Sequence, residues 1–150
     1  MGFSVGTCFL AAYIGSVFTA SSIPGWYAAL KKPWFNPPNW VFAPVWTVLY
    51  LLMGISLYRV LSTKKKSRIK NIGLAYFFVQ LIINVLWSYV FFGLKAPLNA
   101  FVVIVCLWLS ILFTYFYFVR VDKKAGQFLI PYLGWVSFAS ILNLAIVVIN

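Results

Sequence analysis

The sequence predicts an all-α membrane protein, a bundle of five transmembrane helices with a long loop rich in proline and tryptophan after the first helix. Two observations lead to this fold class. Of the 150 residues, 64% are hydrophobic and only 9% are charged, whereas a soluble domain carries roughly 25% charged residues. In addition, five apolar segments are each long enough to span a bilayer as a helix, which takes about 20 residues. They cover residues 4–21, 41–61, 69–92, 98–119 and 127–149.

These segments are interpreted as helices because each is continuously apolar and none shows the alternation of a strand in a membrane barrel. The connections between them are too short for a second domain, so residues 1–150 are expected to form a single transmembrane domain. The first segment lacks the basic region that begins a cleaved signal peptide, since the first lysine of the chain is Lys31. We therefore expect it to remain as the first transmembrane helix.

The distribution of basic residues predicts the topology. The formal net charge is +11, and nine of the twelve basic residues fall on one side of a five-helix path. These nine are Arg59, Lys64, Lys65, Lys66, Arg68, Lys70, Arg120, Lys123 and Lys124. Because positive charge concentrates in cytoplasmic loops, the N-terminus and the two basic connections are predicted to be cytoplasmic. The tryptophan-rich loop and the C-terminus are predicted to lie outside. The run KKKSRIK is interpreted as a topology signal that contacts anionic membrane lipid, and no nucleic-acid partner is predicted.

The composition excludes most acid–base and metal chemistry. The chain has no histidine, and its only acidic residue is Asp122, which lies in a basic connection. Paired-carboxylate catalysis, Ser-His-Asp nucleophiles and metal sites of histidine or carboxylate are therefore excluded, and no metal site is predicted. Cys8 and Cys106 both fall within apolar segments, where a thiol behaves as a small hydrophobe. A ligand would have to be bound by aromatic surfaces, amides, hydroxyls and backbone groups.

Three polar or aromatic residues share one face of the third helix. Gln80, Asn84 and Trp87 are spaced i, i+4, i+7. Two carboxamides are costly in hydrocarbon unless they are paired, so this face must look into the bundle. Hydrogen bonds between helices and a cavity wall that orients a ligand explain the spacing equally well.

The first and fifth helices each present a patterned face. On the fifth, Trp135, Ala139, Leu142 and Asn143 lie together, although Trp135 alone would also suit an anchor at the membrane interface. On the first, small residues recur every four positions, and we interpret them as packing contacts within the monomer rather than a dimer seam. They are Ala12, Ser16 and Ala20, and Ala11, Gly15 and Thr19.

The loop between the first two helices combines proline with aromatic residues. Four prolines exclude one regular helix from Ile23 to Trp40, because each disfavours helix at the residue before it. A short helical turn is compatible with Trp26 to Leu30. An aromatic belt at the interface explains any single tryptophan, but it does not require rigid proline. A stiff cap over the mouth of the bundle requires both.

Residues spread over nearly the whole chain match the pattern of one family. From the loop to the second helix they are Trp26-Tyr27, Leu30, Lys32-Pro33, Pro37-Pro38, Trp40, Pro44, Trp46, Leu49-Tyr50 and Met53-Gly54. On the third helix they are Gln80, Asn84, Trp87 and Phe91-Phe92-Gly93, and on the fifth Pro131-Tyr132-Leu133, Trp135, Phe138-Ala139 and Leu142-Asn143. In this order they resemble the TspO/MBR family of tryptophan-rich sensory proteins, translocator proteins and peripheral benzodiazepine receptors, in its bacterial form.

The resemblance implies a five-helix bundle, usually a homodimer, with a pocket closed by the first loop. It implies binding of porphyrins such as protoporphyrin IX, or of other flat hydrophobic molecules such as benzodiazepine-site ligands. No cofactor is required, porphyrin being a ligand, and a bacterial cell membrane is expected. The fifth helix ends SILNLAIVVIN and lacks the tyrosine and arginine of the animal cholesterol motif, so cholesterol is not expected as a partner. The candidate binding residues are Ser16, Thr19, Trp26, Tyr27, Phe42, Ala43, Pro44, Trp46, Gln80, Asn84, Trp87, Trp135, Ala139 and Leu142.

Three functions remain compatible with the sequence. The first is a membrane binding protein or sensor for porphyrins, acting in tetrapyrrole or stress regulation. The second is light-dependent oxidative degradation of bound porphyrin, in which Trp46 and Trp135 would be the catalytic residues. The third is transport of porphyrin or lipid, which the lack of membrane carboxylates and of inverted repeats disfavours.

Overall fold

The apolar segments form long helices, because a helix satisfies its own backbone hydrogen bonds where no water is available. The computed structural model describes residues 2–64 and 67–150. Among these residues, five helices are long and apolar enough to cross a membrane, which confirms the predicted fold class. The helices in chain order are α1 (Gly2–Ser22), η1 (Ile23–Tyr27), α2 (Asn39–Leu61), α3 (Arg68–Ser88), η2 (Tyr89–Gly93), α4 (Pro97–Val121), α5 (Lys123–Gln127) and α6 (Ile130–Ile149).

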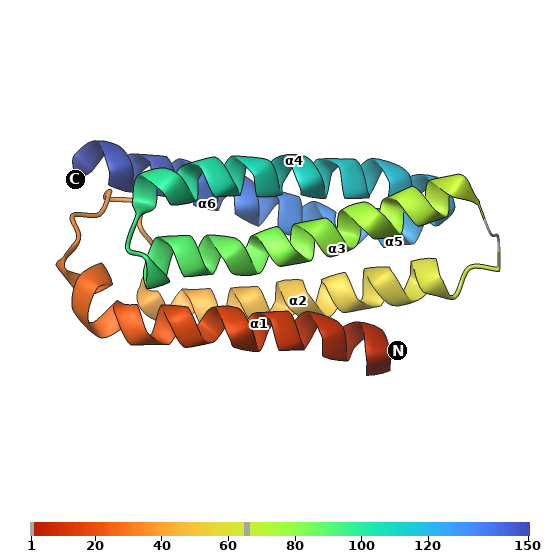
Figure 1. The fold of residues 1–150 in the computed structure, drawn as a ribbon, viewed down its shortest axis with the longest axis horizontal. Helices are drawn as coiled ribbons and strands as arrows, with labels where there is room; N and C mark the ends of the chain where they lie inside the picture. The colour runs from red at the N-terminus through yellow and green to blue at the C-terminus, as the bar shows by residue number, and fades with distance from the viewer. Residues whose placement is uncertain (1, 65–66) are drawn as a thin grey trace.

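The helices run side by side as one bundle (Figure 1). α1 packs along α2, α3 packs along α4, and α4 packs along α6. The N-terminal end of α1, the end of α2, the start of α3 and the short α5 lie at one end of the bundle. The loop after η1, the α3–α4 connection and the C-terminus lie at the other end. The basic connections are therefore gathered at the end of the N-terminus, opposite the tryptophan-rich loop.

The helix bounds depart from the expected ranges in three places. The helix of the first segment continues past Pro24 to Tyr27, through the π-helical turn η1. The prediction that Pro24 denies helix at the preceding residue is therefore wrong for Ile23. Because the helix is continuous there, Pro24 removes one backbone hydrogen bond, and at this point the helix changes from α-helical to π-helical. The range 69–92 divides into α3 and the π-helical η2, and the range 127–149 starts within α5.

The core at the N-terminal end of the bundle is built by apolar side chains from all the long helices. Leu57 of α2, Phe77 of α3, Phe118 of α4 and Val136 of α6 are completely buried in one cluster. Close helix contact is needed at Gly54, where a Cβ atom would lie only 2.8 Å from the Cα of Val5 on α1. α1 and α2 therefore meet tightly near the N-terminal end of α1.

The loop between η1 and α2 has two kinds of aromatic residue. Trp34 of the loop and Trp40 of the first turn of α2 are 95% and 74% exposed, so they face away from the bundle as an interfacial anchor would. Phe35 turns inward and contacts Phe138 of α6, with ring centroids 6.2 Å apart. The segment therefore presents some rings outward and turns others toward the bundle.

Candidate functional site

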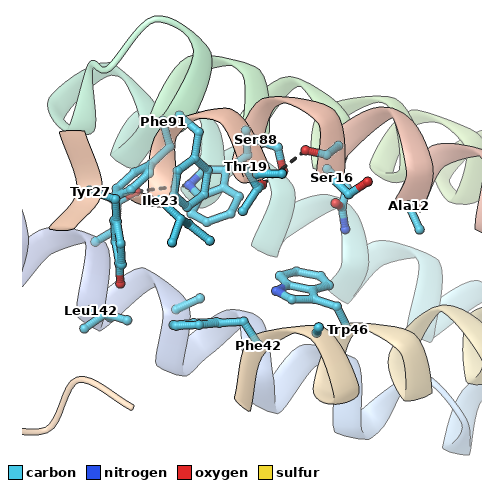
Figure 2. A pocket seen from close by; sticks show the side chains of 18 of the residues that line it. Ala12, Ser16, Thr19, Ile23, Tyr27, Phe42, Trp46, Ser88, Phe91 and Leu142 are labelled. Carbon is cyan, nitrogen blue, oxygen red and sulfur yellow. Dashed lines mark hydrogen bonds between the residues drawn. The ribbon is translucent and has the colours of Figure 1, made fainter. Parts of the chain in front are cut away.

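A cavity of about 310 Å³ lies between the helices at the loop end of the bundle (Figure 2). Side chains from α1, η1, α2, α3, η2 and α6 line it. They are Ala12, Gly15, Ser16, Thr19, Ala20, Ile23, Tyr27, Phe42, Ala43, Trp46, Tyr50, Asn84, Trp87, Ser88, Phe91, Phe92, Trp135, Ala139, Leu142, Asn143 and Ile146. The volume is that of a pocket for a small organic ligand, at the lower end of the usual range.

Small side chains on α1 create the space. Gly15 approaches α3 so closely that a Cβ atom would lie 3.3 Å from Ser88 Oγ. Ser16 and Ala20 line the cavity and are exposed, as is Ala43 of α2. The cavity therefore reaches the outer surface of the bundle between α1 and α2. The interpretation of these small residues as packing contacts within the monomer was incomplete, because they also form one wall of the site.

Aromatic rings form the wall opposite α1. Phe42 and Trp46 point from α2 into the cavity and face Thr19 and Ile23 (Figure 2). Trp135 of α6 packs edge-to-face against both, at centroid distances of 6.0 Å to Phe42 and 6.4 Å to Trp46. Rings held in this way offer a flat ligand large apolar faces with little freedom to move.

Trp135 lies in the cavity wall, so the interfacial-anchor interpretation does not apply to it. Its indole nitrogen Nε1 is buried, and among the described residues no acceptor reaches it. A buried donor without a partner is costly. Trp135 therefore supplies a ring face to the site, while its N–H is buried beneath that surface without a partner among the described residues.

A chain of hydrogen bonds runs from the cavity into the core. Tyr50 Oη donates to Asn84 Oδ1 at 2.7 Å, and Asn84 Nδ2 donates to Tyr132 Oη at 2.6 Å. Tyr132 Oη then donates to Gln80 Oε1 at 2.7 Å, and Gln80 Nε2 contacts Met53 Sδ at 3.8 Å. Gln80 therefore belongs only to the interhelical network, whereas Asn84 belongs to the network and also lines the cavity.

A second polar contact fixes Trp87. Its Nε1 donates to Asn143 Oδ1 of α6 at 3.0 Å, and Asn143 Nδ2 donates to the Pro97 carbonyl at 2.9 Å. The Trp87 ring stacks on Phe91 at 5.4 Å. The carboxamide of Asn143 thus holds α3, α4 and α6 together at the edge of the cavity.

The loop is attached to the bundle beside the cavity. Ser22 Oγ donates to the Phe92 carbonyl, and Tyr27 Oη donates to Asn36 Oδ1 at 3.3 Å. The ammonium of Lys32 lies 4.6 Å from the centre of the Tyr27 ring. Burial raises the pKa of the Tyr27 phenol, and the hydrogen bond to Asn36 offsets part of that increase. Tyr27 is therefore a neutral, nearly buried link between the loop and the cavity.

The structure brings most of the candidate binding residues together. Eleven of them line the cavity: Ser16, Thr19, Tyr27, Phe42, Ala43, Trp46, Asn84, Trp87, Trp135, Ala139 and Leu142. Three others do not. Trp26 packs against Phe91 at 5.5 Å behind the lining, Pro44 is exposed, and Gln80 is buried in the hydrogen-bond chain.

Sequence reasoning left several lining residues out of the candidate set. Tyr50 and Asn143 were detectable, because each shares a helix face with a candidate residue. Ser88 and Phe91 had the same signal, because they lie four residues after the candidates Asn84 and Trp87. Phe92 had none, since it enters the lining from the π-helical turn at the end of α3. That turn changes which side chains face the bundle.

The fold and the cavity define a class: integral membrane proteins that enclose an aromatic-walled pocket within five helices. The chain belongs to the TspO/MBR family, whose model matches residues 4–149, and the resemblance seen in the sequence is thereby confirmed. The tryptophan-rich protein TspO of Chlorobaculum tepidum is 45% identical over 97% of this chain and 92% of its own length. The TspO of Archaeoglobus fulgidus is 47% identical over 92% and 88%. The human translocator protein is 34% identical over 95% and 85%.

Proposed function

We propose that this protein binds porphyrins such as protoporphyrin IX, or similarly flat hydrophobic ligands of the benzodiazepine-site type, as a membrane sensor in tetrapyrrole or stress regulation. The observation that carries the proposal is the cavity itself, in which the rings of Trp46 and Trp135 stand 6.4 Å apart beside the amide of Asn84. A related protein of Cereibacter sphaeroides is named a tryptophan-rich sensory protein. The chemistry of the wall suits ring stacking combined with one or two directional hydrogen bonds.

The size of the cavity distinguishes between these ligands. At about 310 Å³ it suits a drug-sized aromatic ligand as it stands. A tetrapyrrole is larger and would extend through the open side between α1 and α2, past Ser16 and Ala43. The lysines of the loop, Lys31 and Lys32, lie at the same end of the bundle and would pair with ligand carboxylates.

Titration of the detergent-solubilised protein with protoporphyrin IX, followed by tryptophan fluorescence, tests the proposal. We expect Asn84→Leu and Trp135→Phe each to weaken binding by roughly fivefold or more, because each removes a contact of about 1 kcal/mol. Trp34→Phe is the matched control, since Trp34 is exposed and remote from the cavity. Unchanged affinity in both cavity variants would show that the ligand binds elsewhere.

A second candidate function, light-dependent degradation of bound porphyrin, is favoured by the aromatic relay around Trp46. Its ring lies 5.8 Å from that of Tyr50, in addition to its contact with Trp135. These oxidisable rings would donate electrons to a photo-excited ligand, with oxygen as the oxidant. Illumination of the complex should bleach porphyrin absorbance faster than in free porphyrin, and Trp46→Phe with Trp135→Phe should remove the difference. Equal bleaching with and without protein would reject this function.

We also propose an orientation and an assembly. The basic connections and the N-terminus lie at one end of the bundle (Figure 1), and the positive-inside rule assigns that end to the cytoplasm of a bacterial cell. The protein is proposed to be a homodimer. Accessibility of single cysteines introduced into the two ends would check the orientation, and light scattering in detergent would check the mass.

A further inference from the structure

The direction of the hydrogen-bond chain behind the cavity is set by its last member. The chain runs Tyr50, Asn84, Tyr132, Gln80, Met53, and each member except Met53 donates to the next. A thioether sulfur accepts hydrogen bonds but has no hydrogen to donate. The group that faces Met53 Sδ must therefore be the NH₂ of Gln80, and not its carbonyl oxygen.

This constraint passes along the chain one residue at a time. With its NH₂ toward Met53, Gln80 presents Oε1 to Tyr132, so Tyr132 must donate there. The Tyr132 oxygen is then free to accept, and Asn84 must turn its NH₂ toward it. Asn84 consequently presents Oδ1 to Tyr50, whose only hydroxyl hydrogen is used in that bond. All five residues are 5% exposed or less, so bulk water competes little for the bonds between them.

The opposite direction is the alternative that Met53 excludes. If both amides were flipped, Gln80 Oε1 would face the sulfur with no hydrogen between them. Tyr132 would then donate to Asn84, and Asn84 would donate to Tyr50. The hydroxyl hydrogen of Tyr50 would be free to point into the cavity. The two directions thus give Tyr50 opposite roles toward a ligand.

We propose that Tyr50 is a specificity-determining residue that acts toward a ligand only as a hydrogen-bond acceptor, because Met53 sets the direction of the chain behind it. This inference rests on the proposed function, and it adds the class of ligand. The preferred ligand carries an N–H or O–H donor at the edge that meets Tyr50, beside the ring of Trp46. A ligand that offers Tyr50 only an acceptor atom meets lone pairs and gains no bond there.

Carbazole and dibenzofuran provide the test, because these flat tricycles have nearly the same shape and differ in an N–H against an oxygen atom. Their dissociation constants are measured by calorimetry on the whole protein in detergent micelles. We expect carbazole to bind about three- to tenfold more tightly, the usual effect of one hydrogen bond. Tyr50→Phe should bring the two constants together. Tyr58→Phe, a change on the exposed side of the same helix, should leave the preference intact.

Met53→Leu tests the direction of the hydrogen-bond chain while leaving the Tyr50 hydroxyl in place. It conserves volume and removes the acceptor, so both directions become comparable and about half of the molecules present Tyr50 as a donor. Carbazole affinity should then fall about twofold while the protein stays folded. Equal affinity for the two tricycles in the unmodified protein, or a preference that survives Tyr50→Phe, would overturn the inference and leave the proposed function standing. If neither tricycle binds, the inference fails, and the titration with protoporphyrin IX decides separately whether the proposed function holds.

Discussion

The side-chain amide of Asn150 forms a two-sided pair with the backbone of Lys31, a residue 119 positions away in the chain. Asn150 Oδ1 accepts from the Lys31 N–H at 3.1 Å, and Asn150 Nδ2 donates to the Lys31 carbonyl at 2.8 Å. The same amide nitrogen also donates to the Ile146 carbonyl of α6 at 2.9 Å. The loop between η1 and α2 is therefore fastened to the end of α6 through its own peptide groups, whatever side chain occupies position 31.

Removing this fastening should make the loop open more often. We expect Asn150→Ala to accelerate the release of protoporphyrin IX several-fold, because two exposed hydrogen bonds contribute about 1 kcal/mol together. Stopped-flow dilution measures the release rate. Val148→Ala, on the exposed side of the same helix, is the control. Identical release rates in both variants would mean that the loop does not limit ligand exit.

Filling the cavity should reduce binding without unfolding the protein. Ala139 lies in the lining between Trp135 and Leu142, so Ala139→Leu places new methyl groups in the space that a ligand needs. Affinity for protoporphyrin IX should fall about tenfold or more, with little change in the melting temperature. Ala145→Leu, on the same helix but outside the lining, should leave affinity unchanged. Loss of binding together with a large fall in melting temperature would instead indicate overpacking of the core.

Asn143 should matter for stability more than for ligand contact. Asn143→Leu leaves the Trp87 indole N–H and the Pro97 carbonyl without their partner, which should lower the free energy of unfolding by about 1–3 kcal/mol. Thermal unfolding in detergent measures the effect. Trp87→Phe should lower the free energy of unfolding less in the Asn143→Leu variant than in the unmodified protein, because in that variant it removes a donor that is already unpaired. Strict additivity would argue against the hydrogen bond.

The contact of α1 with α2 at Gly54 should tolerate no side chain. In Gly54→Ala the new Cβ would lie 2.8 Å from the backbone of Val5, so the helices must separate and the melting temperature should fall by several degrees. Gly134→Ala is the matched control, since nothing lies within 4 Å of the added atom. Gly134→Ala should leave the melting temperature unchanged or raise it slightly, because alanine has a higher helix propensity than glycine. Equal behaviour of the two variants would contradict the close approach.

The polar residues of α3 show how far spacing predicts a site. Gln80, Asn84 and Trp87 share a face as their spacing predicts, yet the face extends from the core to the cavity and only the last two residues reach the lining. Spacing assigns residues to one side of a helix, but it does not say how deep in the bundle each turn lies. Tyr132, which completes the network, comes from α6 and lies on no shared helix face with them.

The loop illustrates the same limit for aromatic residues. Proline and tryptophan content predicted a rigid aromatic segment, and Tyr27 and Phe35 do turn toward the bundle. Pro44, one of the candidate binding residues, is exposed and does not line the cavity. The loop is also held by the contact of Lys31 with Asn150, which is 119 residues away and cannot be predicted from the composition of the loop.

The sequence by itself determined the five spans, the gathering of positive charge at alternate connections, and the family. These properties follow from composition over about 20 residues at a time and from residue identities in order, which need no knowledge of packing. Only the tertiary structure decided that small residues of α1 open a cavity and that Trp135 faces it. It also decided that a sulfur atom in the core directs the hydrogen bonds that end at Tyr50. Such features depend on contacts between helices, because hydrogen-bond direction and empty space are properties of several side chains at once.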